Sequence, residues 1–449
     1  MNIKLYQTCR DTKDRLSLSK KRFKWENAPL DSYRIIYLNP EYTYQTFIGF
    51  GGAFTESSAD ALNRVSEENR TKALEAYFHP YKGIGYSFCR THINSCDFSL
   101  SNYACCELAD DVELKTFNIN REKRLLIPLI KDALKIKKSP IKIFASPWSP
   151  PAWMKTNNDM NHGGKLKPKY RKTWALYFVK FIKAFQREKI SIWGITVQNE
   201  PQAVQRWDSC IWTAEEEGVF VRDFLGPIFQ RYNLKNVKIM IWDHNKDHIL
   251  TRVRTTLQDP ETRKYVWGIG FHWYNGDFFE NLDKVHELFP DKNLVFTEGC
   301  NEYYLGKEGW HWPERYGHDI IGNLNNWTVA WADWNIVLDE KGGPNHVNNF
   351  CDAPIIADTK NNKIILRPSF YYIGHFSKFI KPGAKRIHFA KSISDLEVTA
   401  FVNPDSTIAV VVLNRTEKEF NFQIKLFSKA FSTEIKPRSI QTYLIGKKI

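Results

Sequence analysis

Eight short apolar segments recur along the chain, and segments with helical spacing separate them. The apolar segments lie at 47–54, 86–93, 141–148, 193–200, 237–244, 267–274, 293–300 and 329–336. Nearly continuous apolar runs are typical of strands that are buried on both faces of a parallel sheet. Eight β-then-α repeats therefore predict an α/β fold, a closed (β/α)8 barrel of parallel strands rather than an open sheet.

Four of the intervening segments have clear amphipathic helical patterns. They lie at 66–78, 122–136, 170–185 and 214–229. Ser66 and Thr213 stand immediately before acidic residues at the start of the first and the last of these segments. Small hydroxyl residues cap helix N-termini and acidic residues complement the helix dipole, so we expect both helices to begin there.

The pattern changes after a last helical segment at 367–380. From Pro382 and Gly383 onward, short alternating strands and turns predict an antiparallel β module of about 65 residues. Because this is short for an independent sandwich, we expect the strand-like segment 32–39 to complete it. The predicted organisation is thus 1–45, the N-terminal part of a β-sandwich; 46–380, the catalytic barrel; and 381–449, the C-terminal part of the sandwich.

The chain is basic, with 64 Lys and Arg residues against 50 Asp and Glu residues, a net charge of +14. Such an excess could attract nucleic acid or anionic lipid. The basic residues are scattered, however, and the densest cluster, at 135–142, is interrupted by Ile136, Pro140 and Ile141. We therefore expect a solvated basic surface and no nucleic-acid partner, and the sequence leaves contact with a membrane surface open.

Residues 1–23 contain no apolar core of a signal peptide. We therefore expect a cytoplasmic protein, or a secreted one if a leader has been removed. The eight cysteines lack regular spacing, which predicts reduced thiols used as small buried apolar side chains. Asp243, His244, Asp247 and His248 are the residues nearest to a metal-ligand pattern, but no further group completes a site, so we predict no metal and no cofactor.

The strand assignment is also a prediction of the active site, because barrels of this kind bind substrates at the C-terminal ends of their strands. Polar and aromatic residues at those ends are Arg90, Asn94, Asp97, Trp148, Asn199, Glu200, His272, Tyr274, Glu298, Asp333 and Trp334. The fourth and seventh predicted strands each end in a glutamate. Two converging carboxyl groups are what cleavage of a glycosidic bond requires.

The surroundings expected for these two glutamates differ. A carboxylate beside Arg90 and hydrogen-bonded by Tyr274 should stay ionised, and its neighbour should then retain a proton. We therefore assign Glu298 as the nucleophile and Glu200 as the acid/base of a retaining glycosidase. Asn199, next to Glu200, is placed to bind a sugar 2-hydroxyl, and the aromatic content of 14% suits the apolar faces of sugar rings.

Nine sequence segments carry a resemblance to a known family. They are GFGGAFTESSA (49–59), SCDFS (95–99), ASPWSPPAWMKTN (145–157), TVQNEP (196–201), FHWY (271–274), FTEGC (296–300), WADWN (331–335), GGPNHVNNF (342–350) and PSFYYIGHFSKFIKPG (368–383). In these segments the chain resembles glycoside hydrolase family 30, the family of lysosomal glucosylceramidase. The resemblance implies a TIM barrel with a β-sandwich formed from both termini, and a double displacement that retains the anomeric configuration.

The resemblance also implies roles for individual residues. The residues matching positions that bind a terminal glucose are Asp97, Trp148, Asn199, Trp334 and Asn349. Tyr274 matches a residue near both carboxylates and Arg90 one that supports the nucleophile, and we add His272 as a second supporting residue. Trp331 is expected to belong to the core. Asp97 as a ligand of the hydroxymethyl group would favour glucose over xylose.

Two departures from the lysosomal pattern fall around the expected pocket mouth. Residues 102–111 replace a loop that contains tyrosine and threonine, and His346 stands where an aromatic residue is usual. They leave the ceramide specificity open. We favour an exo-acting β-glucosidase of glucosylceramide-like lipids or short β-glucosides, with a role in sphingolipid metabolism. The alternatives are β-1,6-glucanase, β-xylosidase or β-fucosidase activity, or a non-catalytic protein that binds carbohydrate or anionic surfaces.

Overall fold

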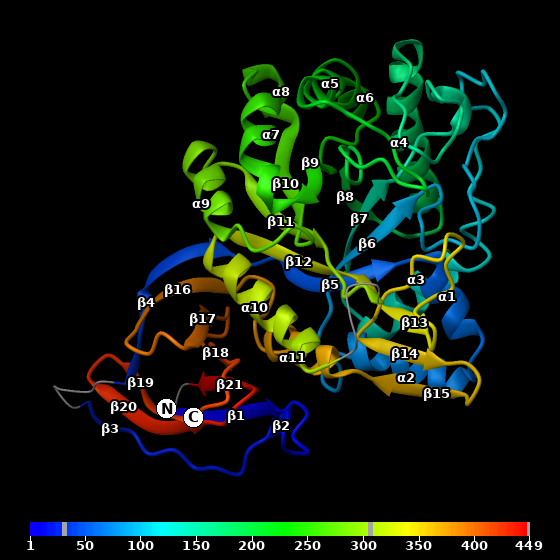
Figure 1. Ribbon diagram of the computed structural model, residues 1–449. Helices are drawn as coiled ribbons and strands as arrows, with labels where there is room; N and C mark the ends of the chain where they lie inside the picture. The colour runs from blue at the N-terminus through cyan, green and yellow to red at the C-terminus, as the bar shows by residue number, and fades with distance from the viewer. Residues whose placement is uncertain (29–33, 304–308, 447–449) are drawn as a thin grey trace.

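A closed barrel of eight parallel strands forms the centre of the molecule (Figure 1). The computed structural model describes residues 1–28, 34–303 and 309–446. The barrel strands are β5 (Gly49–Phe54), β6 (Phe88–Ile93), β7 (Lys142–Pro147), β8 (Ile192–Thr196), β9 (Lys238–Asn245), β10 (Val266–His272), β11 (Asn293–Glu298) and β12 (Thr328–Asn335). The predicted (β/α)8 architecture is confirmed, and each strand lies within its predicted segment to within a few residues.

The main difference concerns the fourth barrel strand. β8 ends at Thr196, so Asn199 and Glu200 lie in the loop that follows rather than in the strand. Glu200 has a φ of 46°, in the left-handed region, and its backbone N–H donates to the carbonyl of Asp243 at 2.9 Å. The chain turns sharply here, and the turn directs the Glu200 side chain to the barrel mouth.

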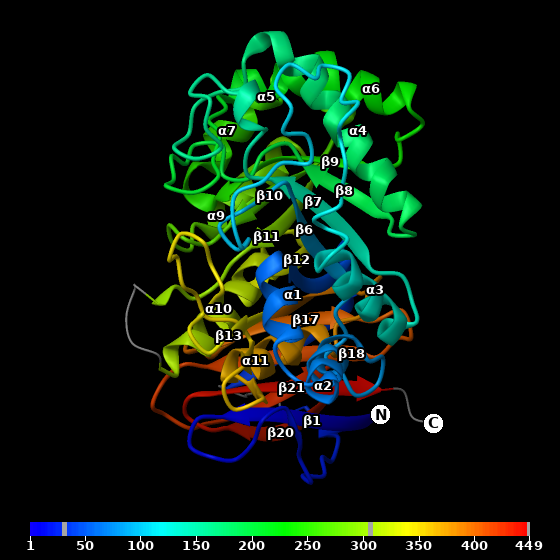
Figure 2. The same cartoon turned by 90° about the vertical axis from the view of Figure 1, so that its right-hand side faces the viewer.

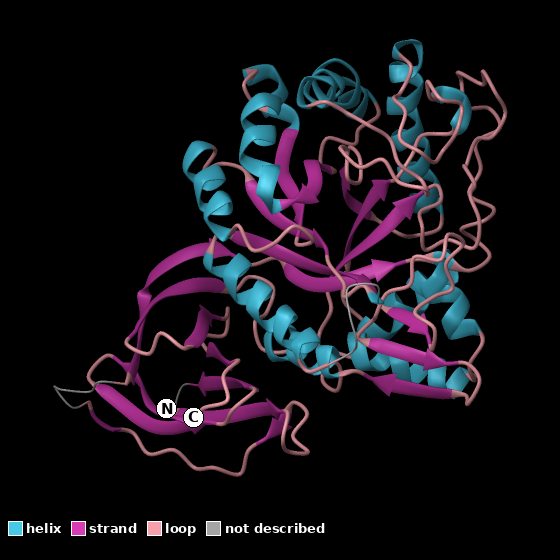
Figure 3. Cartoon of the chain, viewed as in Figure 1, coloured by secondary structure: helices cyan, strands magenta, loops and turns pink. Residues whose placement is uncertain are grey.

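Helices surround the barrel on its outer side (Figure 3). They are α1 (Glu56–Asn63), α2 (Glu67–Phe78), α3 (Leu126–Lys137), α4 (Arg171–Arg187), α5 (Ala214–Phe220), α6 (Gly226–Arg231), α7 (Ile249–Thr256), α8 (Pro260–Tyr265), α9 (Phe279–Leu288), α10 (His311–Asn325) and α11 (Pro368–Ser377). Short 3₁₀ helices span Ala152–Met154, Pro168–Tyr170 and Lys246–His248. The segment predicted as one helix at 214–229 is α5 and α6 joined by a π-helical turn at Val221–Leu225.

Both predicted helix caps are present. The Ser66 hydroxyl accepts a hydrogen bond from the Asn69 backbone at the start of α2. Thr213 and Glu216 form a reciprocal capping box at the start of α5. Two backbone donors that the helix itself cannot satisfy are thereby paired. On the inner side, α4 buries Trp174, Phe178 and other aromatic side chains against the barrel.

The second module is a ten-stranded sheet of order β2-β1-β21-β18-β17-β16-β4-β19-β20-β3. Its strands are β1 (Asn2–Cys9), β2 (Ser17–Leu18), β3 (Glu26–Asn27), β4 (Ile35–Thr46), β16 (Lys385–Lys391), β17 (Leu396–Val402), β18 (Ile408–Asn414), β19 (Phe420–Leu426), β20 (Lys429–Ile435) and β21 (Ser439–Gly446). β4 pairs antiparallel with β16 and parallel with β19. The segment expected at 32–39 therefore takes its predicted place, although residues 32 and 33 lie outside the described residues.

The two ends of the chain meet in this sheet. β1 pairs antiparallel with β21 from Asn2–Gly446 to Cys9–Ser439. Figure 2 shows the first and last strands side by side beneath the barrel. A sandwich built from both termini is thus confirmed, and its core is filled by inward apolar side chains such as Leu5, Ile36 and Val410.

A small third sheet follows the last barrel strand and was not predicted. It consists of β13 (Val337–Asp339), β14 (Ile355–Asp358) and β15 (Lys363–Leu366). β13 and β14 fix the two ends of the intervening loop, 340–354, which reaches the barrel mouth.

The barrel interior changes character along its axis. Near the N-terminal ends of the strands it is apolar, with Phe88, Phe144, Met240 and Val295 in one cluster. Inward side chains alternate along a strand, so Arg90 lies one layer above Phe88. All eight cysteines are buried, as expected for small apolar side chains. In the described part of the chain, no helix combines the length and hydrophobicity needed to span a bilayer.

Candidate active site

A cavity of about 840 Å³ opens at the C-terminal ends of the barrel strands. The predicted catalytic and substrate-binding residues all line it: Asp97, Trp148, Asn199, Glu200, Tyr274, Glu298, Trp334 and Asn349. The two predicted supporting residues, Arg90 and His272, are fully buried and hydrogen-bond to groups of this lining. The structure therefore brings all ten residues together, from six of the eight barrel strands and their following loops.

Arg90 is the cation at the centre of the site. Its Nη1 donates to Glu298 Oε2, and its Nη2 donates to Asn199 Oδ1 at 2.9 Å and to Asp243 Oδ2 at 2.7 Å. The guanidinium lies 4.6 Å from the ring centroid of Trp148. Buried charges are tolerated only when they are paired and hydrogen-bonded, and one guanidinium provides this for two carboxyl groups at once.

Glu298 is held at both of its oxygens. It is the last residue of β11, and while Arg90 contacts Oε2, the Tyr274 hydroxyl donates to Oε1 at 2.8 Å. Burial raises the pKa of Glu298, with Glu200 adding to the effect, and the opposing influence of His272 and Arg90 does not cancel it. The carboxyl group is thus fixed in orientation and more basic than an ordinary glutamate.

His272 connects Glu200 to Asp243. Its Nε2 lies 3.0 Å from Asp243 Oδ1, and its Nδ1 lies 3.2 Å from Glu200 Oε1. Burial raises the pKa of Asp243, but Arg90, His272 and Thr196 outweigh it and hold the pKa well below its usual range. An ionised Asp243 accepts from Nε2, so a second proton on the ring is shared between Nδ1 and Glu200.

The charges around His272 favour this second proton. Burial lowers the pKa of His272, but Glu298, Asp243 and Glu200 reverse the effect and raise it to about 9. Burial likewise raises the pKa of Glu200, but His244 and His272 outweigh it and leave the pKa lowered. Because burial lowers the pKa of His244 itself, His244 is charged and acts on Glu200 only at acidic pH. Near pH 7 the cation beside Glu200 is His272.

These directions correct one step of the sequence argument. That argument placed the retained proton on Glu200 and an ionised, less basic carboxylate at Glu298. The structure instead raises the pKa of Glu298 and lowers that of Glu200. The reason is His272, whose position between Asp243 and Glu200 the strand pattern could not reveal. The proton expected on Glu200 is therefore held between Glu200 and the His272 ring.

Two tryptophans and two polar residues form the rest of the predicted lining. The rings of Trp148 and Trp334 stack on each other with centroids 5.1 Å apart. Asn349 Nδ2 donates to Asp97 Oδ2 at 2.9 Å. Among the described residues, the other Asp97 oxygen, Oδ1, is buried without a hydrogen-bond partner. Burial and the nearby Glu298 raise the pKa of Asp97 well above its ordinary value.

Some residues at strand ends have other roles. Asn94 accepts a hydrogen bond from Tyr177, and Asp333 accepts one from Tyr316 at 2.9 Å, so both hold the structure around the site. Trp331 is fully buried in the core, as predicted. Further lining residues that the sequence analysis did not assign to the sugar site are Ala203, Gln205, Arg206, Trp207, His244, Asn245, Asn275, Glu302, Tyr303, Asn348, Phe350, Cys300 and Cys351.

Asp243 is the site residue that sequence reasoning misplaced. The sequence analysis considered it only as a metal ligand together with His244, Asp247 and His248. In the structure Asp243 is bound by Arg90 and His272, while Asp247 accepts from Asn275 at 2.9 Å. Its place near the C-terminal end of the fifth barrel strand, β9, was the sequence feature that could have assigned Asp243 to the active site.

Three groups in or directly behind the cavity lining have the chemistry of metal ligands. One ligand atom each from Glu200, His244 and His272 lies within 4.8 Å of the others. A metal ion there would have to displace the proton that Nδ1 of His272 shares with Glu200, since histidine binds metals as the neutral ring. The arrangement therefore favours a proton over a metal ion.

Comparisons with known proteins extend over the whole fold. The sequence matches the Glycosyl hydrolase family 30 TIM-barrel domain over residues 47–380 and the Glycosyl hydrolase family 30 beta sandwich domain over residues 383–443. It is 37% identical to the lysosomal acid glucosylceramidase of Mus musculus over 430 residues, 91% of this chain and 83% of that protein.

Two solved structures are similar along their full length. SrfJ from Salmonella typhimurium has a TM-score of 0.96 at 35% sequence identity, and all of both chains is covered. The endo-β1,6-glucanase BT3312 has a TM-score of 0.90 at 31% identity, again with all of both chains covered.

The raised pKa of His272 predicts how stability depends on pH. The group is protonated up to about pH 9 in the folded chain but only to about pH 6.5 in the unfolded chain. Its contribution to stability is therefore complete below pH 6.5 and is lost as the pH rises through 9, a change of about 3 kcal/mol. Urea unfolding at pH 6 and pH 10 measures it.

We expect wild type to lose about 3 kcal/mol more over this pH range than His272→Gln loses. His162→Gln is the control, because His162 is exposed and should behave as wild type does. Parallel losses of stability in wild type and His272→Gln would show that His272 is not a buried cation.

Proposed function

Because the chain belongs to glycosyl hydrolase family 30 and is therefore a glycosidase, we propose that it is a retaining, exo-acting β-glucosidase. The observation that carries the proposal is the pair of carboxyl groups of Glu200 and Glu298. They line one cavity and have different partners: a histidine for Glu200, an arginine and a tyrosine for Glu298. A nucleophile and an acid/base require such different surroundings.

Glu298 is proposed as the nucleophile. Arg90 and Tyr274 fix its carboxylate, so that one oxygen can attack the anomeric carbon while the other keeps its hydrogen bond. Burial raises the pKa of Glu298, and a more basic carboxylate is a stronger nucleophile. Arg90 and Tyr274 also stabilise the carboxylate when it is released again in the second step.

Glu200 is proposed as the acid/base, working with His272. In the first step the proton shared between His272 and Glu200 passes through Glu200 to the departing oxygen, while Glu298 forms an ester with the sugar. The negative charge of Glu298, which raises the pKa of His272, is lost at that moment. Glu200 is then ionised, and it takes a proton from the attacking water and returns it to the pair. The proton count of the enzyme is the same after each turnover.

The remaining lining is proposed to bind one sugar ring. Asn199 Oδ1 accepts from Arg90, which leaves its amide N–H groups to donate to the 2-hydroxyl as far as the described residues show, an interaction that strengthens in the transition state. Trp148 and Trp334 present an apolar wall. Asp97, whose Oδ1 lies buried and unpaired within the described structure, would accept from another hydroxyl together with Asn349.

Exo action is supported by the contacts at one end of the cavity. Asp97 and Asn349 meet there, and Arg206 Nη2 donates to the carbonyl of Asn348, the neighbour of Asn349, at 3.2 Å. An end closed in this way would hold the non-reducing terminus of a substrate. The similarity to the mouse glucosylceramidase supports glucosylceramide-like lipids as substrates and a role in sphingolipid metabolism. Endo-β-1,6-glucanase activity is the second candidate, because of the likeness to BT3312.

A substrate panel tests the proposed function. It comprises aryl β-glucoside, β-xyloside and β-fucoside, glucosylceramide, and β-1,6-gluco-oligosaccharides, with proton NMR of the first sugar released. We expect preference for glucosides and β-glucose as the first product, since two displacements restore the configuration. Glu298→Gln should be slower by about 10³-fold or more. Release of α-glucose first would contradict retention, and release of internal gluco-oligosaccharides would replace exo by endo action.

The role of Glu200 predicts a dependence on the leaving group. Glu200→Ala should lose about 10²- to 10⁴-fold in kcat/KM on alkyl β-glucosides, because a poor leaving group needs a proton. It should lose far less on dinitrophenyl β-glucoside, whose leaving group departs as an anion. Glu68→Ala, at an exposed position of α2, is the control. Equal losses on both kinds of substrate would remove Glu200 from the acid role.

A further inference from the structure

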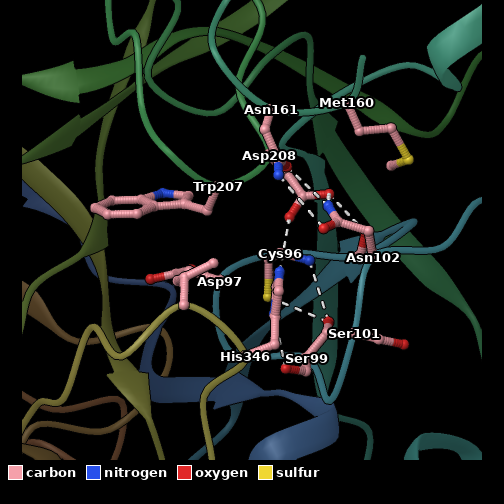
Figure 4. Close-up of polar contacts among 12 residues, drawn as sticks. Cys96, Asp97, Ser99, Ser101, Asn102, Met160, Asn161, Trp207, Asp208 and His346 are labelled. Carbon is pink, nitrogen blue, oxygen red and sulfur yellow. Dashed lines mark hydrogen bonds and ion pairs between the residues drawn. The ribbon is translucent and has the colours of Figure 1, made fainter.

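A buried carboxylate, Asp208, lies just outside the cavity in the loop between β8 and α5 (Figure 4). Its side chain has no exposed surface. Oδ1 accepts from the Ser95 hydroxyl at 2.5 Å and from Asn102 Nδ2 at 3.0 Å. Within the described residues, Oδ2 has no hydrogen-bond partner and lies 3.9 Å from His346 Nε2. Burial raises the pKa of Asp208.

His346 approaches Asp208 from the loop 340–354 between β13 and β14, which follows the barrel strand β12. Its Nδ1 lies 2.9 Å from the Ser99 carbonyl oxygen. A carbonyl can only accept, so Nδ1 carries the hydrogen and the ring is held with Nε2 directed towards Asp208. The His346 side chain is 10% exposed, and its Nε2 is buried. His346, which stands where the resembled family usually has an aromatic residue, is therefore held between the Ser99 carbonyl and Asp208.

Loops from four different barrel strands meet at this point. The loop after β6 contributes Ser95, Ser99 and Asn102. The loop after β7 contributes Asn161, whose Oδ1 accepts from Asn102 Nδ2 at 2.8 Å and whose backbone forms a β-bridge with Asp208. The loops after β8 and β12 contribute Asp208 and His346. A single buried carboxylate thus ties together segments that are far apart in the sequence.

Two of these loops carry the pair at the closed end of the cavity. Asp97 is two residues from Ser95, and Asn349 is three residues from His346. Their contact, Asn349 Nδ2 to Asp97 Oδ2 at 2.9 Å, leaves the buried Oδ1 of Asp97 as an acceptor for a ligand. Trp207, next to Asp208, lines the same cavity as Asp97 and Asn349, and Figure 4 shows it close to Asp97.

The position of Asp97 against Asn349 depends on how these two loops are held. A hydroxyl is recognised well only when its partners are fixed to within a fraction of an ångström. A buried carboxylate with one unsatisfied oxygen is costly, and Asp208 contacts loops at the barrel mouth through Ser95, Asn102 and His346. Its contacts all serve to hold the loops that carry the two hydroxyl-binding groups.

Building on the proposed function, we propose that Asp208 and His346 are positioning residues that set recognition of the sugar hydroxyl at the closed end of the cavity. They act through Ser95 and Ser99 on the loop of Asp97, and through the backbone around His346 on Asn349. Neither residue contacts the substrate. Asn199 is held independently by Arg90, so recognition of the 2-hydroxyl should not depend on them.

Deoxy substrates test the proposal. kcat/KM is measured on aryl β-glucoside and its 2-, 3-, 4- and 6-deoxy analogues, and the ratio of parent to analogue is the penalty for losing each hydroxyl. In wild type, the hydroxyl bound by Asp97 should show a penalty of about 10- to 100-fold, as for a hydrogen bond to a charged group. Asp97→Ala identifies that hydroxyl, because this variant has no acceptor for it and its penalty should largely disappear.

In Asp208→Ala and His346→Phe we expect the penalty for losing the hydroxyl bound by Asp97 to fall below about threefold, while the 2-deoxy penalty stays as in wild type. Asp208→Asn should retain most of it, because an amide oxygen still accepts from Ser95 and Asn102. Glu314→Gln removes a buried carboxylate far from the cavity, which pairs with Arg438, and should lower stability without changing any penalty. A purely structural role for Asp208 would lower kcat/KM on all substrates by the same factor, leave every penalty as in wild type, and overturn the proposal.

A second measurement does not require activity. Backbone hydrogen exchange within 95–103 and 344–351 should accelerate at least about tenfold in Asp208→Ala and His346→Phe, while exchange in β18 stays as in wild type. Unchanged exchange in both loops overturns the proposal. If wild type does not hydrolyse the parent aryl β-glucoside, the proposed function is refuted. Hydrogen exchange would still decide whether Asp208 and His346 hold the two loops.

Discussion

The buried guanidinium of Arg90 is the interaction on which the rest of the site depends. It reaches Glu298, Asp243 and Asn199 from the wall of β6, and it lies against the indole of Trp148. Two carboxyl groups in the interior of a barrel would repel each other and lose their hydration. A guanidinium that donates one N–H to each of them offsets both costs. The apolar layer of Phe88 and its neighbours below excludes water from this network. The Arg90 side chain therefore both compensates the buried charges of the barrel interior and positions the residues of the site.

The network extends from Arg90 to the proposed acid. Arg90 keeps Asp243 ionised, Asp243 holds the His272 ring, and His272 shares a proton with Glu200. In the proposed mechanism, the proton available to a leaving group is thus controlled by Arg90, Asp243 and His272 together with Glu200. The same arrangement explains why the pKa of Glu200 is lowered in the free protein although its proposed role is to donate a proton, because the proton is stored on its neighbour.

The sequence predicted what depends on local pattern and on barrel symmetry. Continuous apolar runs located all eight barrel strands, and because parallel strands end at one face, the strand ends placed Glu200 and Glu298 in one cavity. It did not predict what depends on contacts between distant segments. The bond of His272 to Asp243 and the approach of His346 to Asp208 each join residues whose proximity only the closed barrel and its loops create.

The central claim is that the carboxylate held by Arg90 and Tyr274 is the one that forms the covalent bond to the sugar. The most direct measurement uses a 2-deoxy-2-fluoro-β-glucoside with a good leaving group, followed by mass spectrometry of the intact protein and of its peptides. The fluorine slows release of the intermediate, so the account predicts one fluoroglucosyl group per chain, attached to Glu298. A label on Glu200 or elsewhere, or steady hydrolysis of the reagent without any covalent label, would contradict it.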